Sequence, residues 1–303
     1  MKSPGSSETV REAAPKALVL GGATGLLGQA LTRTLTQAGW HVETLGRADG
    51  NITDIAFLTN RLAQSGPDVV FNAAAWTQVE EAEAQPEQAR LLNCTLPDAL
   101  ARTLKSLGHG HLVHFSTDFV FSGQKNVAWT EQDTPKPISV YGSTKLAGEQ
   151  AVLEILAERT CVVRTAWLFG PGRKNFVQTI LDKAKHAESV QVVFDQTGSP
   201  TYSLDLAHWS VALAEKRATG LWHAVNGGQA TWAELASEAI TLSRCRCRVV
   251  PVSSEQWPQK AKRPAWSVLD TSKLAGFLNH APRPWPQALR DYLYSILEAD
   301  NND

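Results

Sequence analysis

The feature of this sequence that most constrains its fold is a glycine-rich turn between a short apolar run and a helical segment. The run 18–20 is followed by Gly22, Gly25 and Gly28 at the spacing G-x-x-G-x-x-G, and apolar residues then recur at helical intervals over 26–38. A strand that ends in such a turn and continues into a helix predicts the first unit of a βαβ dinucleotide-binding fold.

Each glycine has a separate task in that interpretation. Gly22 permits the tight turn, Gly25 lets backbone N–H groups approach a pyrophosphate, and Gly28 lets the helix pack closely on the strand. The helix N-terminus adds about half a positive charge toward the phosphate. An ordinary strand-to-helix turn is the alternative, but the position in a βαβ unit favours a cofactor turn made of Gly22, Thr24, Gly25, Leu26, Leu27 and Gly28.

Strand-length apolar runs alternate with helical segments as far as residue 170. Strands are predicted at 18–20, 41–45, 69–71, 112–115 and 161–165, and helices at 26–38, 54–64, 79–105 and 140–159, with Pro86 and Pro97 dividing the third helix into two pieces. Strands that alternate with helices imply right-handed crossovers and a parallel sheet covered on both faces. We therefore expect an α/β fold built on a Rossmann-type doubly wound sheet.

Beyond residue 170 the pattern is less regular. Helices are expected at 175–186, 203–216, 231–243 and 284–299, and strands at 190–194 and 221–225. We interpret residues 1–15 as a flexible tail and 16–170 as an NADP(H)-binding Rossmann domain, to which 195–226 return. Residues 171–194 and 227–303 are expected to form a smaller α+β domain that binds the substrate.

Charge and cysteine usage exclude several classes of partner. The chain has 29 Lys and Arg against 30 Asp and Glu, so nothing in its formal charge of −1 attracts nucleic acid or an anionic membrane. The uncharged stretch 17–32 is too short and too rich in glycine to span a membrane, and residues 1–15 lack the apolar core of a signal peptide. Four scattered cysteines fit reduced thiols, so we expect a cytoplasmic protein.

The end of the second expected strand bears on which dinucleotide is bound. An acidic residue there accepts the ribose 2′-hydroxyl of NAD, whereas an arginine accommodates the 2′-phosphate of NADP. Arg47 occupies this place and the first acid is Asp49. The residues favour NADP(H); NAD(H), with Arg47 a solvated surface residue, is the alternative.

Tyr141 and Lys145 lie four residues apart, on one face of an expected helix. A phenol with a pKa near 10 is a reluctant proton carrier at neutral pH, and a neighbouring ammonium is expected to lower that pKa. Thr117 ends the fourth expected strand, where the carboxyl ends of a parallel sheet line the ligand crevice. Its hydroxyl is a candidate for orienting a substrate oxygen; a strand-terminal capping role is the alternative.

Together these residues resemble the extended short-chain dehydrogenase/reductase family, and within it the dTDP-4-dehydrorhamnose reductases. The resemblance runs from Lys16 to about Tyr292. Its matching segments are 22–28, 72–79 with Glu83, 116–121, 141–149, 164–167, 175–177, 195–201 and 263–274. The last two of these segments separate this group from most epimerases and dehydratases.

The resemblance implies that NADPH delivers a hydride to C4 of dTDP-4-dehydro-6-deoxy-L-mannose, giving dTDP-L-rhamnose. It implies that Tyr141 donates the proton, that Lys145 tunes Tyr141 and holds the nicotinamide ribose, and that Thr117 orients the ketone. It further implies cofactor contacts at Ala73, Ala74, Ala75 and Ser116. For the nucleotide sugar it implies contacts at Thr77, Val79, Asp118, Phe119, Trp167, Asn175, Gln196 and Arg263, the last facing the diphosphate.

Some residues depart from the family pattern. Phe119 stands where a tyrosine is usual, and Ala30 stands where many members carry a glutamate associated with a divalent metal, so the sugar and any metal dependence stay open. A homodimer is compatible with the family. The alternatives are a reductase of another nucleotide-activated 4-keto sugar, and a catalytically silent dinucleotide-binding regulator similar to the regulatory subunit of methionine adenosyltransferase.

Two further groups are given structural interpretations. The acids Glu80, Glu81 and Glu83 are expected to form the solvated start of a helix, where the helix dipole favours negative charge. His109, His111 and His114 lie around the start of a strand and lack acidic or cysteine partners at ligand spacing, so no metal site is expected there.

Overall fold

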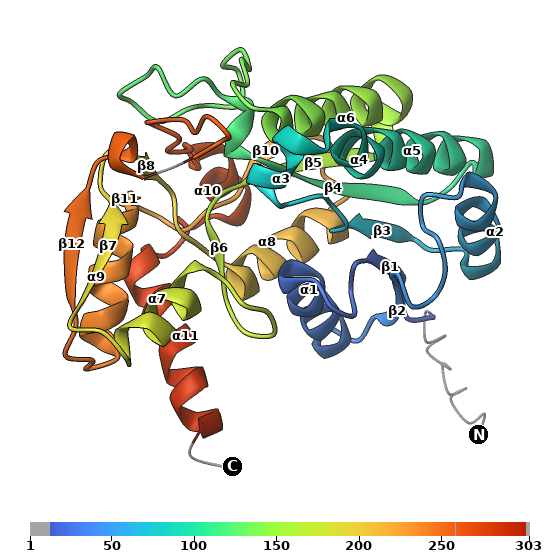
Figure 1. Cartoon of the computed structure of the whole chain (residues 1–303). Coiled ribbons are helices and arrows are strands. Elements are labelled where there is room, and N and C mark those ends of the chain that lie inside the picture. Colours follow the sequence, from blue (N-terminus) through green and yellow to red (C-terminus); the bar gives the residue numbers. More distant parts are fainter. Residues whose placement is uncertain (1–12, 258, 301–303) are drawn as a thin grey trace, which may run out of the picture.

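A six-stranded parallel sheet forms the larger part of the molecule (Figure 1). The structure, a computed structural model, describes residues 13–257 and 259–300. The strand order is β10-β5-β4-β3-β1-β2. The strands are β1 (Lys16–Leu20), β2 (His41–Leu45), β3 (Val69–Asn72), β4 (His111–Thr117), β5 (Thr160–Thr165) and β10 (Gly220–His223).

Helices cover both faces of this sheet, as the alternation of strands and helices predicts (Figure 1). Odd-numbered residues of β1 and β4, such as Val19 and Val113, pack with α1 (Leu26–Gln37) and α8 (Ser203–Glu215). Even-numbered residues of the same strands pack on the other side. There they meet α2 (Ile55–Ser65), α5 (Leu96–Leu107) and α6 (Val140–Leu156). Burial on both faces explains why these strands read as continuous apolar runs.

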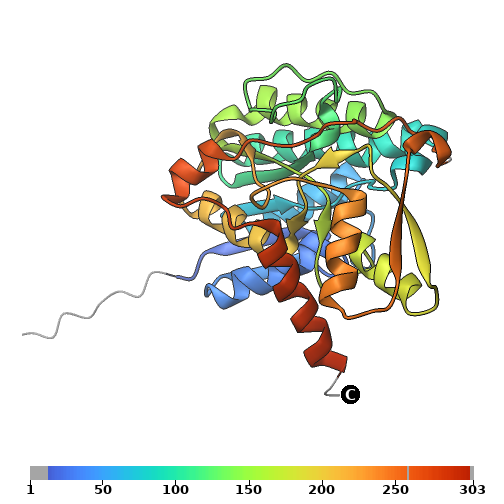
Figure 2. The ribbon, with the colours of Figure 1, turned by 90° about the vertical axis from the view of Figure 1, so that its left-hand side faces the viewer.

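A second, smaller group of elements lies beside one end of the sheet (Figure 2). Its two-stranded parallel sheet pairs β7 (Ser189–Val193) with β12 (Arg248–Val252). The helices α7 (Phe176–Ala184), α9 (Trp232–Leu242) and α11 (Trp285–Asp300) pack around it and enclose two apolar clusters of their own. Within the segment 195–226, α8 packs on α1 and β10 extends the large sheet beside β5.

Short strands connect the two groups. β6 (Leu168–Phe169) pairs with β9 (Thr201–Tyr202), and β8 (Thr197–Gly198) pairs antiparallel with β11 (Ala230–Thr231). These pairs join the segment that follows β5 to the start of α9. They therefore fix the residues beyond the carboxyl end of the sheet relative to the smaller group of elements.

The third expected helix differs from its prediction at one of the two prolines. The chain breaks at Gln85, between α3 (Val79–Ala84) and α4 (Pro86–Arg90), but it continues through Pro97. A π-helical stretch, Leu91–Thr95, leads directly into α5, so Pro97 falls in the first turn of a helix. Pro97 is tolerated there because the N–H groups of a first turn need no partner within the helix.

The remaining expected strands and helices are confirmed, with ends that differ by a few residues. Not foreseen were β12, which contains a proline, and the short helix α10 (Ser272–Leu278). The expected flexible tail lies outside the described residues up to residue 12. All four cysteines are free, and among the described helices none is long and apolar enough to cross a membrane.

Candidate active site

The glycine-rich turn lies between β1 and α1, and its tight bend falls one residue earlier than expected. Gly21 has a φ of 75°, a conformation that glycine adopts without strain, whereas Gly22 has no positive φ. Gly22 is needed for a different reason, since a Cβ there would lie 2.6 Å from the Thr44 methyl group. Gly21 therefore makes the left-handed bend, and Gly22 permits the close approach of Thr44 within the same turn.

The other two glycines keep a cradle open in front of α1. A Cβ on Gly28 would overlap the carbonyl oxygen of Gly21, and one on Gly25 would lie 2.8 Å from the same oxygen. Gly25 is the N-cap of α1 and contributes no side chain to it, so the first-turn amides of α1 are not capped by a side chain. Free amides at a helix N-terminus, with bare backbone beside them, fit the pyrophosphate of a dinucleotide.

Arg47 follows β2 in an exposed turn. Asp49, the nearest acid, accepts a hydrogen bond of 2.8 Å from the backbone N–H of Gly46, so its carboxylate is engaged within the turn. The cationic side chain is therefore the group that this turn offers to a ribose substituent. That arrangement suits a 2′-phosphate better than a 2′-hydroxyl.

The segment that follows β3 contributes small residues beside the glycine-rich turn. Ala73 and Ala74 come directly after β3, and a Cβ at Gly21 would lie 3.4 Å from the backbone of both. Ser116, near the end of β4, is buried, and its hydroxyl has no hydrogen-bond partner among the described residues. A buried orphan hydroxyl at this edge is a suitable contact for a cofactor.

Tyr141 is held in place at the first turn of α6. The Ser139 hydroxyl caps the helix by accepting from the N–H of Gly142 at 3.1 Å. Glu83, from α3, accepts from the N–H of Val140 at 2.8 Å. Gly142 packs so tightly against the carbonyl oxygen of Phe119 that no side chain would fit, which fixes α6 against the end of β4.

The phenol of Tyr141 is partly buried and has an unusually high pKa. Burial raises its pKa to about 12, a hydrogen bond with Thr117 opposes the rise, and the nearby Asp118 adds to it. We expected Lys145 to lower this pKa, but the desolvation of the phenolate prevails and the ammonium is engaged elsewhere. Tyr141 is accordingly a neutral phenol at pH 7, able to donate a proton.

Lys145 lies one helical turn further along and is 2% exposed. Its Nζ donates a hydrogen bond of 2.6 Å to the carbonyl oxygen of Phe115 in β4. Burial lowers the pKa of Lys145 to about 8, and the charge of Glu149 opposes that fall. The lysine therefore fixes α6 to the carboxyl end of β4 and places an amine at that end of the sheet.

Asp118 completes the polar cluster and is 1% exposed. Its carboxylate accepts a hydrogen bond of 3.0 Å from the Thr117 hydroxyl. Burial raises its pKa to about 6, against hydrogen bonds from Ser267 and Thr117. Phe119 occupies the position at which the family pattern has a tyrosine. Its ring packs edge to face on Tyr141, with ring centroids 5.5 Å apart.

The expected substrate residues lie around this cluster with different exposure. Thr77 is exposed and Val79 begins α3, both in the segment beyond β3. Gln196 is buried. Trp167, just beyond β5, is partly buried and stacks on Trp232, with ring centroids 3.5 Å apart.

Two of the expected substrate residues are engaged within the fold. Asn175 caps α7, and its amide donates to the carbonyl oxygen of Gly170 at 2.8 Å and to the Tyr292 hydroxyl at 2.9 Å. Arg263 donates to Glu80 at 2.8 Å. The geometry therefore gives Asn175 a structural role and makes Arg263 available to a diphosphate only in competition with Glu80.

Two of the acidic residues of α3 are not simply solvated at the start of the helix but make contacts with distant segments. Glu80 accepts from the backbone N–H groups of Lys260 and Ala261 as well as from Arg263. Together with the Glu83 contact to α6, this joins α3 to two segments that are distant in sequence. Sequence spacing carries no signal for either contact, because each partner lies at least 57 residues away.

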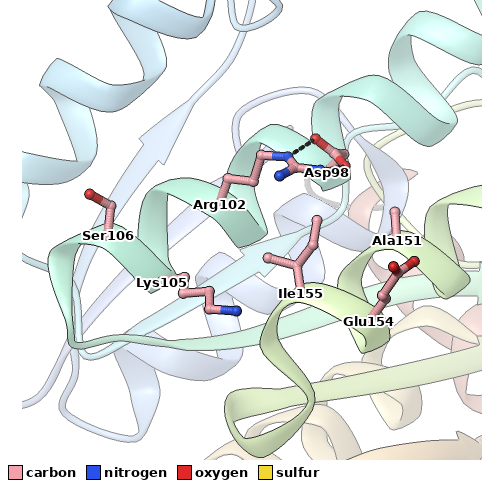
Figure 3. Close-up of a pocket in the computed structure, with 7 residues that line it drawn as sticks. All are labelled: Asp98, Arg102, Lys105, Ser106, Ala151, Glu154 and Ile155. Carbon is pink, nitrogen blue, oxygen red and sulfur yellow. Dashed lines mark hydrogen bonds and ion pairs between the residues drawn. The ribbon is translucent and has the colours of Figure 1, made fainter.

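No cluster of three His, Cys, Asp or Glu residues that could hold a metal occurs in the part of the chain that the structure describes. Figure 3 shows a surface hollow between α5 and α6 that is lined mostly by charged and polar side chains, with an ion pair between Asp98 and Arg102. None of the expected site residues lines this hollow. We do not assign a function to it.

Comparison with known proteins decides the family. The family model described as the RmlD substrate binding domain matches residues 16–297. The chain belongs to this family. A dTDP-4-dehydrorhamnose reductase of Streptomyces griseus is 40% identical over 91% of this chain and 92% of the relative. A probable dTDP-4,6-dihydroxy-2-methyloxan-3-one 4-ketoreductase of Streptomyces antibioticus is 38% identical over 92% of this chain and 95% of the relative.

Solved structures of RmlD-type proteins have the same fold. A dTDP-4-dehydrorhamnose reductase of Clostridium acetobutylicum superposes with a TM-score of 0.89 at 33% identity, over 93% of this chain and 99% of the other. One from Bacillus anthracis, solved in complex with NADP, has the same TM-score at 30% identity, over 93% of this chain and all of the other. The expected fold class, a Rossmann-type parallel sheet, is confirmed by the strand order and by these neighbours.

Proposed function

We propose that the protein is an NADPH-dependent reductase of the 4-keto group of a dTDP-activated 6-deoxyhexose. The substrate that fits best is dTDP-4-dehydro-6-deoxy-L-mannose, with dTDP-L-rhamnose as product. The observation that carries this proposal is the cluster of Thr117, Tyr141 and Lys145 at the carboxyl end of β4. Two relatives that are 40% and 36% identical to this chain are named dTDP-4-dehydrorhamnose reductase.

The crevice residues fit a bound NADP(H). The uncapped amides of α1 would hold the pyrophosphate, and Arg47 would bind the 2′-phosphate. Ala73, Ala74 and Ala75 leave room for the cofactor along the end of β3, while Ser116 and Lys145 would bind on the nicotinamide side. The NADP complex of the Bacillus anthracis relative supports this choice of cofactor.

The chain's own residues supply the proton and orient the ketone. NADPH, when bound, supplies the hydride that reduces C4. The Tyr141 phenol would donate to the carbonyl oxygen. The Thr117 hydroxyl would donate to the same oxygen after turning away from Asp118, and the two donors together would select the position of the ketone. An alkoxide is a stronger base than a phenolate of pKa about 12, so the neutral Tyr141 can protonate the oxygen as charge develops on it.

The smaller group of elements would bind the rest of the substrate. We propose that residues 171–194 and 227–300 form the substrate side of the crevice, facing the NADP(H)-binding part. Trp167 and Gln196 then contact the sugar, and Val79 and Thr77 border it from the segment after β3. Arg263 reaches the diphosphate if it leaves Glu80, a competition that an anionic ligand favours.

The test mixes the purified protein with NADPH and enzymatically generated dTDP-4-dehydro-6-deoxy-L-mannose and follows the absorbance of reduced nicotinamide. We expect steady oxidation by the wild type and a loss of at least about 100-fold in kcat for Tyr141→Phe, with unchanged NADPH affinity. Tyr294→Phe, on the exposed face of α11, is the matched control. NADPH that is bound but not oxidised would contradict the proposal and favour a regulatory role.

A further inference from the structure

Trp167 has a backbone conformation that a bulky residue rarely adopts. Its φ is 47°, in the left-handed region that is otherwise occupied mainly by glycine and asparagine. Such a conformation is unfavourable for a bulky residue and persists only where its surroundings enforce it. The residue lies two positions beyond the last residue of β5, which pairs with Thr117 at the end of β4.

Three neighbours enforce this conformation. The backbone N–H of Thr201 donates to the carbonyl oxygen of Trp167 at 3.2 Å. The indole of Trp232 stacks on that of Trp167, with centroids 3.5 Å apart and planes within 5° of parallel. Gly198 leaves space for the ring, because a Cβ there would lie 2.5 Å from the indole of Trp167.

Trp232 is itself held firmly. It is the first residue of α9, whose N-terminus is closed by a capping box between Thr231 and Glu234. Phe176 packs on its ring at a centroid distance of 4.6 Å. Because α9 belongs to the smaller group of elements, Trp232 gives the indole of Trp167 a support that is independent of the large sheet (Figure 1).

Trp167 also contacts apolar clusters of both groups of elements. One of them contains Val120 and Phe121, which follow Asp118, and the other contains the residues around α11. The indole therefore packs against a cluster close in sequence to Asp118 and against a cluster of the smaller group of elements, and it is only partly buried. A rigid aromatic surface at such a place suits the apolar face of a deoxyhexose.

We propose that Trp232 is a positioning residue for the sugar of the substrate, acting through Trp167. Together with Gly198 it fixes the strained indole as the wall of the sugar subsite. This inference rests on the proposed function, because the ligand is the 4-keto-6-deoxyhexose. Trp232 touches neither the reacting carbonyl nor the cofactor in this account, so its loss should affect sugar binding and leave NADPH binding unchanged.

The test compares Trp232→Leu, Trp232→Phe and Gly198→Ala with the wild type in the NADPH oxidation assay. We expect Trp232→Leu to raise the KM for dTDP-4-dehydro-6-deoxy-L-mannose at least about fivefold, with the KM for NADPH within about twofold of wild type. Trp232→Phe retains a stacking ring, so its KM for the sugar nucleotide should be close to that of the wild type. Gly198→Ala introduces a methyl group that would displace the indole of Trp167, so it should raise the KM for the sugar nucleotide as well. This variant tests the proposal even if Trp232→Leu fails to fold.

A double-mutant cycle separates positioning from a merely structural role. Once Trp167→Ala has removed the indole, adding Trp232→Leu should change the sugar KM by less than about twofold. Phe277→Leu, which removes an aromatic partner of Trp222 at the outer edge of the sheet, is the control and should leave both KM values unchanged.

The outcomes separate the two proposals. Additive effects in the cycle, or equal rises in KM for NADPH and sugar, would overturn the role of Trp232 while leaving the reductase proposal intact. A wild-type protein that does not oxidise NADPH with this sugar would overturn the proposed function, and this inference with it.

Discussion

At the scale of single residues, the polar cluster combines groups whose ordinary chemistry is altered by burial. Tyr141 keeps its proton because its phenolate would be poorly solvated. Burial destabilises the charged form of Lys145 and lowers its pKa to about 8. The two side chains were expected to act on one another directly. In the structure each is linked first to β4 or its end, Tyr141 through Thr117 and Lys145 through Phe115.

Arg47 gives a prediction at the same scale. Arg47→Ala should raise the KM for NADPH by about 10-fold or more and leave the KM for NADH nearly unchanged, because only NADPH carries the 2′-phosphate that the guanidinium would bind. Steady-state kinetics with both cofactors measures the ratio. Arg102→Ala, in the hollow between α5 and α6, is the control. Equal changes for both cofactors would remove Arg47 from the cofactor site.

Single residues also mark where sequence reasoning was limited. The glycine spacing, Tyr141 with Lys145, and Arg47 could be located from the chain because each depends on local geometry. The partners of Asn175 and Arg263 could not, because their hydrogen bonds reach Tyr292 and Glu80 across more than 100 residues. The left-handed conformation of Gly21 could not be located either, since two adjacent glycines are equally permissive.

At the scale of elements, the site depends on how α6 begins. Tyr141 lies in the first turn, so any movement of that turn moves the phenol relative to Thr117. Glu83 ties the turn to α3 through the N–H of Val140, while Ser139 caps it from within. The acid of α3 thus controls the distance between the proposed proton donor and the substrate oxygen.

Glu83→Ala should therefore lower kcat by about 10- to 100-fold, because a small displacement of a positioned group is costly in rate. The affinity for NADPH, measured by fluorescence titration, should stay within about twofold of wild type. Glu81→Ala, an exposed acid in the same helix, should behave as wild type. Equal effects of the two substitutions would show that α3 contributes charge or helix stability only.

Elements were predictable where the pattern was local and strong. Strands such as β1 and β3 could be found because burial on both faces makes most of their residues apolar. The continuity of the helix through Pro97 could not, because a π-helical turn is set by how α4 and α5 pack on α6 and leaves no periodicity of its own. Strand β12 was missed because Pro251 argues against a strand unless it lies at an edge.

At the scale of the whole molecule, buried histidines make stability depend on pH. Burial and, to a lesser extent, the nearby charge of Arg217 lower the pKa of His111 to about 4, against 6.5 for an exposed histidine. The unfolded chain therefore binds a proton at a pH at which the folded chain does not. Stability from this residue is complete above pH 6.5 and is lost as the pH falls toward 4.

His111→Gln should accordingly make unfolding less sensitive to acid. Between pH 7 and pH 5 the free energy of unfolding should fall by about 1–2 kcal/mol less in this variant than in the wild type. Urea denaturation at the two pH values measures the difference. His208→Gln, an exposed position on α8, should retain the wild-type drop. An identical drop in His111→Gln would contradict the assignment.

In the proposed reaction, a hydride from NADPH reaches C4 of a 4-keto sugar bound between the NADP(H)-binding part and the smaller group of elements. The most direct measurement uses NADPH deuterated at C4 of the nicotinamide, on each face in turn, with dTDP-4-dehydro-6-deoxy-L-mannose. We predict that one of the two labelled cofactors gives dTDP-L-rhamnose with a single deuterium at C4 of the sugar, located by NMR. Deuterium at another carbon, or a product without deuterium from either cofactor, would contradict the claim.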